Sequence, residues 1–295
     1  LSSLKNPSDS DKVLSFLKKN GFSISQIEKM VKYKPQFLTC SLERVMKPKI
    51  KIFREFGYSA DELAVLVSDH PWILNKAMEK IDHSLAVLKE IVQSNAAVAE
   101  LLRSSGWFLT TDLNKSLVPN IEFLQSCGVT LDQLRSTIYH FPRFFLCSPQ
   151  HLRESVRRAD ELGMKRSSRI FLHGVRVISS MSKEKWDSKW QTLIDVGFSK
   201  DDILKAFRQY PVVFAVSPEK MLKVKEVVLA TGRYDASCIC KDAKSLGCSI
   251  EKWHKPRYQV LEILERKGVI KRWPNYTTLC RQSNLNFYKA YIEPH

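Results

Sequence analysis

Residues 21–57 read GFSISQIEKMVKYKPQFLTCSLERVMKPKIKIFREFG and contain one complete unit of a repeat. Glycine recurs at positions 21, 57, 128, 163, 197, 232 and 268, in steps of 34 to 36 residues apart from one double step of 71. The turn missing from that double step is filled by Gln93, Ser94 and Asn95. Because a fixed period of this length is the signature of repeat architectures, the whole chain is predicted to stack copies of one small motif.

Each repeat is predicted to hold two helices joined by a short turn. Glycine suits the left-handed residue that closes a helix, and a Ser or Thr two residues later, such as Ser23 after Gly21, suits the N-cap of the first helix of the repeat. Apolar residues then recur at helical spacing until a proline, which cannot continue the hydrogen-bond ladder, ends that helix. This proline stands at 35, 71, 142 and 211; Gly106 replaces it in the third repeat, and the fifth repeat is degenerate around residues 174–178.

The second helix is predicted to begin after a Ser or Asp cap at position 41, 112, 148, 182, 217 or 249. Pro48, Pro119 and Pro256 suit its first turn, where no backbone donor is needed. Strand signals are weak, because sustained alternation of apolar and polar residues is absent and no Asn-Gly hairpin turn occurs. The sequence therefore predicts an all-α fold, a right- or left-handed α-solenoid of about seven repeats of about 35 residues. We expect one repeat domain over residues 16–271, an N-terminal cap at 1–15 and a C-terminal cap or tail at 272–295.

Composition limits the classes of protein that fit. The chain has 295 residues, 44% of them hydrophobic, which is too apolar for disorder, and it contains no apolar run long enough to span a membrane. The first residues do not resemble a signal peptide, and seven unevenly spaced cysteines fit a reducing compartment better than a disulfide scaffold. The net charge of +16 indicates an anionic partner. Residues 1–150 hold 19 basic and 15 acidic side chains, and residues 151–295 hold 28 and 16, so most of the excess lies in the second half.

Equivalent positions of the repeats carry a column of basic residues. A cation or a histidine stands three residues after each cap position, and Lys80 is retained although its cap position holds Ala77. A helix N-terminus disfavours cations, so a recurrent cation there is explained if a phosphate binds beside it. The alternative is a solvent-facing slot in which lysine only solvates the surface. The predicted nucleic-acid-binding residues are the column Arg44, Lys80, Lys115, His151, Lys185, Lys220 and Lys252, with Arg153, Arg157, Lys189 and Lys223 beside it.

Other groups of residues point to ordinary core positions. Cys238, Cys240 and Cys248 with His254 could ligate zinc, but one residue between the first two cysteines is tight for a structural site, so no metal and no cofactor are predicted. Trp72 and Trp107 follow the turn position and are predicted to be core residues. Trp186, Trp190 and Trp253 lie near the basic column and fit either base stacking or, more readily, core packing. No catalytic motif is present, so no enzymatic activity and no small-molecule substrate are predicted.

Several repeats share a set of residues that resembles a known family. Gly21-Phe-Ser, an amphipathic helix, Lys-Tyr-Lys-Pro35-Gln-Phe-Leu, Ser41-Leu-Glu-Arg44 and Pro48 are similar to the repeat of the mitochondrial transcription termination factor family, abbreviated mTERF. The pattern returns from Tyr210 to Lys220 and from Ser249 to Tyr258, and the resemblance covers about residues 9–271. The segment Leu285-Asn-Phe-Tyr-Lys-Ala-Tyr291 resembles the land-plant branch.

The resemblance implies a left-handed superhelix with a basic inner groove that holds double-stranded DNA or RNA of an organelle. Members regulate organelle gene expression by terminating or pausing transcription or by assisting RNA processing such as intron splicing. We expect a transit peptide outside this sequence, a monomer with no membrane contact, and a mitochondrial location with the chloroplast as the alternative. Two other hypotheses stay open: an α-solenoid scaffold for a protein partner, and a structural subunit that clamps ribosomal or intron RNA.

Overall fold

The computed structural model describes residues 7–294, and every regular element in this range is helical. None of the described residues lies in a β-strand, which confirms the predicted all-α class. Short turns of 3₁₀ or π helix connect many of the α-helices. The α-helices are α1 (Pro7–Lys19), α2 (Ile24–Tyr33), α3 (Lys47–Glu55), α4 (Ala60–Asp69), α5 (Met78–Val92), α6 (Asn95–Ser104), α7 (Leu117–Ser126), α8 (Leu131–His140), α9 (Pro149–Glu161), α10 (Phe171–Ser179), α11 (Lys183–Val196), α12 (Lys200–Gln209), α13 (Pro218–Leu229), α14 (Ala236–Lys241), α15 (Lys255–Arg266), α16 (Tyr276–Arg281) and α17 (Asn284–Tyr291).

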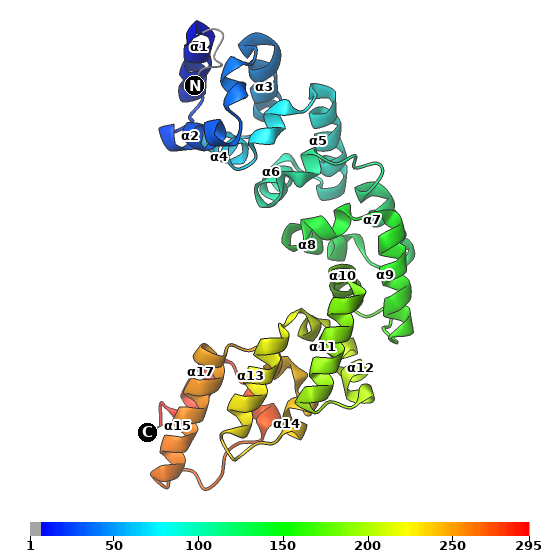
Figure 1. The fold of residues 1–295 in the computed structure, drawn as a ribbon, viewed down its shortest axis with the longest axis vertical. Coiled ribbons are helices and arrows are strands. Elements are labelled where there is room, and N and C mark those ends of the chain that lie inside the picture. The colour runs from blue at the N-terminus through cyan, green and yellow to red at the C-terminus, as the bar shows by residue number, and fades with distance from the viewer. Residues whose placement is uncertain (1–6, 295) are drawn as a thin grey trace. The chain divides into compact units, whose positions relative to one another are not determined.

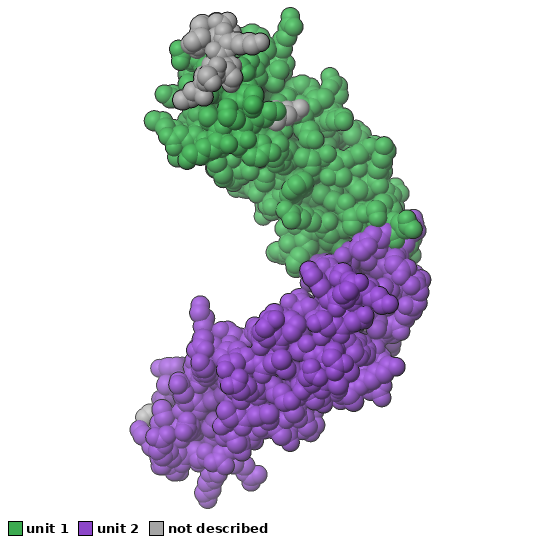
Figure 2. All heavy atoms as spheres, viewed as in Figure 1, with its two compact units in different colours: residues 1–150 green, residues 151–295 purple. Residues whose placement is uncertain are grey.

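The helices stack in pairs within two compact units, residues 1–150 and 151–295 (Figure 2). In the first unit, the first helices of successive repeats (α2, α4, α6 and α8) contact one another in order, and α3, α5 and α7 lie on their other side (Figure 1). In the second unit, α10, α12, α14 and α16 form the corresponding row. This stacking of helix pairs is that of an α-solenoid.

The ends of the chain contain helices of the same kind as the repeats. The expected N-terminal cap begins in residues 1–6, which lie outside the described residues, and from Pro7 the chain forms α1, which runs past residue 15 to Lys19. The expected C-terminal tail contains α16 and α17, a shortened helix pair that packs on α14 and α15. No helix within residues 7–294 has the length and apolar character needed to cross a membrane.

The glycine period sets the turn between repeats, as predicted. Each of the seven recurring glycines has a positive φ, between 63° and 124°. Gln93 fills the missing position with a φ of 67°. Among the described residues, it is the non-glycine residue with a positive φ. A Ser or Thr then caps the first helix: Ser23 Oγ accepts from the Gln26 N–H at 3.3 Å while the Gln26 side chain accepts from the Ser23 N–H at 2.8 Å. The boundaries between repeats therefore lie where the glycine and cap residues of the sequence predict them.

The proline that ends the first helix opens a 3₁₀ turn, and this turn corrects one prediction. Its third and fourth residues are buried, as Ile73 and Leu74 are after Pro71, whereas its second residue points outward. Trp107 occupies the second position and is 47% exposed, so it is not a core residue; Trp72 is half-buried. A 3₁₀ turn has three residues per turn, so the residues next to each other in sequence face different sides. These turns are Pro35–Thr39, Pro71–Asn75, Gly106–Leu109, Pro142–Leu146, Pro211–Ala215 and Ala243–Gly247; the degenerate fifth repeat has α10 in this place.

Proline near the start of the second helix widens the turn before it. Pro48 and Pro256 lie in the first turns of α3 and α15, as predicted, and each follows one π-helical turn, Leu42–Met46 or Ile250–His254. Before Pro119 the Val118 N–H likewise donates to the carbonyl of Leu113, five residues back, at 2.9 Å. Because proline cannot donate to the carbonyl four residues back, the chain adds one residue to the turn at these three places.

Long polar side chains of the second helices tie each repeat to the next. Asn120 of α7 is fully buried, and its Nδ2 donates to the carbonyl oxygens of Phe145 at 3.0 Å and Cys147 at 2.8 Å. At the equivalent place, Lys49 donates to the Leu74 carbonyl, Lys189 to the Val216 carbonyl, and Arg257 to the carbonyls of Leu279 and Gln282. We call these four residues, Lys49, Asn120, Lys189 and Arg257, the clasp residues. Lys49, Asn120 and Lys189 satisfy backbone acceptors in or directly after the 3₁₀ turn of the next repeat, and Arg257 satisfies acceptors at the C-terminal end of α16.

The clasp predicts a specific loss of stability in Asn120→Leu. The substitution leaves two largely buried carbonyls without their donor, which should lower the free energy of unfolding by about 2–3 kcal/mol. Chemical denaturation measures this directly. Asn286→Leu, at an exposed position of α17, is the control and should change the value by less than about 0.5 kcal/mol. Equal stability of the two variants would contradict a structural role for the clasp.

Candidate nucleic-acid interface

The column residues lie at the edge of the stack that carries the proline turns. In four repeats the cap serine accepts a hydrogen bond from the backbone N–H of the column residue, at 3.1 to 3.3 Å. These pairs are Ser41 with Arg44, Ser182 with Lys185, Ser217 with Lys220, and Ser249 with Lys252. The serine therefore fixes the column residue in the first turn of the second helix, or in the π turn that precedes it.

The column side chains differ in what they already contact. Arg44, Lys80, Lys185 and Lys252 are exposed, and the described structure shows no hydrogen bond or ion pair from their side chains. Lys115 is also exposed and lies 3.5 Å from Asp112 in a surface ion pair, which water screens strongly. These five cations can reorient toward an anion at little cost.

Two column residues instead contact the neighbouring repeat. The Lys220 Nζ donates to the Gly247 carbonyl at 2.8 Å, and the His151 Nε2 lies 2.9 Å from the Ser179 carbonyl oxygen. In these two repeats the clasp position holds Ser155 or Val224, which are too short to reach across, and the column residue makes the equivalent contact. Between the second and third repeats, His83 and Asn114 make the contact, at 3.0 Å.

The residues predicted beside the column are partly engaged with other groups. Arg157 pairs with Glu154 and Glu161, and Lys223 Nζ lies 2.8 Å from the Glu226 carboxylate. Arg153 is exposed on α9. Lys189 is a clasp residue, and its burial lowers the pKa of its ammonium group. The structure therefore places Lys189 between repeats rather than on the surface.

A row of acidic residues accompanies the column and is not among the predicted site residues. A glutamate precedes the column residue by one position in five repeats, at Glu43, Glu79, Glu184, Glu219 and Glu251. A carboxylate at this place complements the positive end of the helix and offsets part of the column charge. Glu43 and Glu251 are themselves paired with Lys47 and Lys255, at a distance of 2.5 Å in the second case. The signal was available in the sequence at the same spacing as the column.

The outward positions of the proline turns in the first unit form an aromatic ladder. The Trp72 and Trp107 rings lie 6.2 Å apart, the guanidinium of Arg143 lies 5.3 Å from the Trp107 ring, and His70 lies 5.5 Å from Trp72. The His70 ring also accepts the Gly106 N–H at 3.3 Å, a donor that the usual proline would lack. Trp186 is buried and stacks on Phe214 at 4.2 Å, whereas Trp190 and Trp253 are half-buried.

The cysteines give no metal site in the described residues. All seven cysteines have free thiols, and no group of three or more potential ligands gathers there. His254 is fully buried, with its Nε2 3.0 Å from the Ser245 carbonyl oxygen and its Nδ1 3.0 Å from the Tyr258 hydroxyl. Both ring nitrogens are thus engaged in hydrogen bonds. Burial lowers the pKa of His254 to about 4.

These features define an α-solenoid of two-helix repeats with exposed cations at the proline-turn edge of each compact unit. The mTERF family profile matches residues 14–168 and 94–287, which together cover most of the chain. The chain belongs to the mTERF family, whose members are organellar nucleic-acid-binding regulators of gene expression. It is also similar to "Transcription termination factor MTERF8, chloroplastic" of Arabidopsis thaliana, with 20% identity over 266 residues. That alignment covers 90% of this chain and 52% of the relative, so the chain spans about half the length of that protein.

The clasp and column assignments predict different effects on stability for two lysines that lie four residues apart. Lys189→Met removes the donor from the Val216 carbonyl, and it should lower the free energy of unfolding by about 1–2 kcal/mol. Lys185→Met, at an exposed position of the same helix, should leave it within about 0.5 kcal/mol of the parent value. Denaturant melts of the two variants measure the difference. A larger loss in Lys185→Met would reverse the two assignments.

His254 predicts a loss of stability in weak acid. The folded protein holds the pKa of His254 near 4, below the usual 6.5, so this contribution is complete above about pH 6.5 and decreases as the pH falls toward 4. Between pH 7 and pH 5 the loss should be about 2 kcal/mol. The measurement compares the free energy of unfolding at both pH values in the parent and in His254→Gln. A parent and a variant with the same pH dependence would disprove the assignment.

Proposed function

We propose that this protein binds organellar nucleic acid, as double-stranded DNA or as RNA, through the column cations at the proline-turn edge. The single observation that carries the proposal is the recurrence of exposed cations at one position in five of the repeats, where a cap serine fixes the backbone of Arg44, Lys185 and Lys252. Arg44, Lys80 and Lys115 serve the first compact unit, and Lys185 and Lys252 the second. Arg153, Arg157 and Lys223 add charge near them, and His151, Lys189 and Lys220 contribute mainly by holding the repeats in register.

The geometry of the stack suits a phosphate backbone. Neighbouring helices pack about 8–10 Å apart, and a strand of duplex DNA carries a charge about every 3.4 Å of its axis. Successive column cations would therefore meet about every third phosphate. Contacts of this kind position a nucleic acid without reading its sequence.

Membership of the mTERF family supports a role in organelle gene expression. We propose transcription termination or pausing, or RNA processing such as intron splicing, with the protein acting as a monomer and not as an enzyme. The family resemblance alone had suggested the mitochondrion. The chloroplastic relative favours the chloroplast instead.

The test is the salt dependence of binding by a double charge reversal, Lys185→Glu with Lys252→Glu. Loss of two phosphate contacts should reduce the slope of log Kd against log salt by about 2 and weaken binding equally for unrelated sequences. Fluorescence anisotropy with a labelled DNA duplex and a labelled RNA, at two salt concentrations or more, gives the slope. Lys200→Glu with Lys267→Glu, two exposed lysines at the glycine-turn edge, changes the net charge equally and is the control. Identical slopes for the two double variants would exclude the column as the binding surface.

A further inference from the structure

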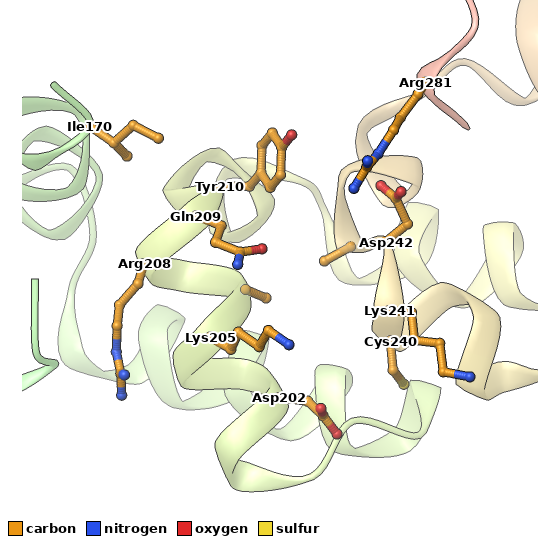
Figure 3. Close-up of a pocket in the computed structure, with 12 residues that line it drawn as sticks. Ile170, Asp202, Lys205, Arg208, Gln209, Tyr210, Cys240, Lys241, Asp242 and Arg281 are labelled. Carbon is orange, nitrogen blue, oxygen red and sulfur yellow. The ribbon is translucent and has the colours of Figure 1, made fainter. Parts of the chain in front are cut away.

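A cleft of about 430 Å³ opens between α12 and α14 in the second compact unit (Figure 3). Lys205, Gln209 and Tyr210 border it from α12 and its C-terminal end, Asp242 from the end of α14, and Arg281 from α16. Figure 3 shows the side chains of Lys205 and Gln209 reaching into the cleft and that of Arg281 extending toward Asp242. The volume is in the range of small-ligand sites.

At the corresponding place in the first repeats an ion pair joins the two helices. There Lys29 lies four residues before the end of α2, Asp69 is the last residue of α4, and the two side chains are 2.6 Å apart. The same two positions between α12 and α14 hold Lys205 and Lys241, which repel each other and cannot pair. The described structure shows no hydrogen bond or ion pair from either lysine. Two lysines in place of an ion pair make this place attractive to an anion.

Asp242 adds a carboxylate acceptor at the wall of the cleft. Its residue is only 8% exposed, and the described structure shows no hydrogen bond or ion pair from its carboxylate, which does not cap the following turn either. Burial raises the pKa of this carboxyl group, although Arg281 and Lys244 oppose the shift. The carboxylate therefore keeps acceptor capacity for a donor that enters the cleft.

Tyr210 supplies a flat apolar surface at the same place. Its residue is 39% exposed, and the Lys244 Nζ lies 6.0 Å from the centre of its ring. The cleft thus combines cations, an aromatic ring and a carboxylate acceptor, which are the groups that recognise a phosphate, a base plane and an amino group.

We propose that this cleft binds one unpaired nucleotide of a single-stranded nucleic acid and prefers cytosine to uracil. Lys205 and Arg281 contact the phosphate, the base packs against Tyr210, and the Asp242 carboxylate accepts a hydrogen bond from the cytosine amino group. Uracil presents a carbonyl oxygen at that position, which the carboxylate repels. The inference rests on the proposed function, to which it adds a base-reading site that the column lacks.

The experiment compares labelled 16-residue oligo(C) and oligo(U) RNA at pH 7.5 on the full chain, by fluorescence anisotropy. We expect about a tenfold preference for oligo(C), the lower part of the range for one base contact. Asp242→Asn should abolish the preference. Asp201→Asn removes the same charge from an exposed position of α12 outside the cleft, and it should keep the preference. Tyr210→Ala should weaken binding of both oligonucleotides. Oligo(dC) and oligo(dU) repeat the comparison for DNA.

The possible results separate this inference from the proposed function. Equal binding of oligo(C) and oligo(U), or a preference that persists in Asp242→Asn, overturns the cleft assignment, while a salt slope that depends on Lys185 and Lys252 would still support the column. Absence of binding to every oligonucleotide and duplex overturns both. A thermal melt of Asp242→Asn that matches the parent shows that the loss of preference does not reflect misfolding.

Discussion

The structure depends on backbone carbonyls that one repeat exposes and the preceding repeat satisfies. Each first helix ends just before a residue such as Pro35 or Pro71, and the 3₁₀ turn that this residue opens leaves acceptors directed at the neighbouring repeat. Asn120 shows the solution most clearly, because its buried amide donates to two of these carbonyls. In other repeats a lysine or an arginine occupies the position equivalent to Asn120 and makes the same kind of contact. The contact fixes the register of stacking, because a displaced repeat would leave a buried acceptor unsatisfied.

This requirement divides the basic residues into two groups that composition cannot separate. Where the clasp position holds a long side chain, as at Lys189, the nearby column residue Lys185 remains available to a partner. Where that position holds Val224, the column residue Lys220 makes the contact between repeats itself. The net charge of +16 therefore overstates the charge available for binding. The glutamates beside the column also lower the positive charge at that place. The proposed interface therefore depends on a few exposed cations.

The fold was predictable because its signals are local. Glycine, cap and proline positions recur at one spacing, and even Gln93 was placed correctly, since a missing glycine in a regular series marks its own position. The outward direction of Trp107 was not predictable in this way, because it depends on the turn being 3₁₀ rather than α-helical. The clasp residues were not predictable for a similar reason, because their spacing from the cap varies. Lys189 lies seven residues after its cap. Asn120 lies eight residues after its cap, because the turn before Pro119 contains one more residue. The cleft residues Tyr210, Asp242 and Arg281 lie on three different repeats, and no spacing in the sequence joins them.

In the proposed complex, nucleic acid contacts the proline-turn edge and not the glycine-turn edge. Lysine footprinting tests it most directly: the protein is acylated with an amine-reactive reagent, with and without saturating nucleic acid, and each lysine is quantified by mass spectrometry. We expect protection of Lys80, Lys115, Lys185 and Lys252, with Lys200 and Lys267 equally reactive in both states. Protection of Lys200 and Lys267 while the column lysines stay reactive would contradict it.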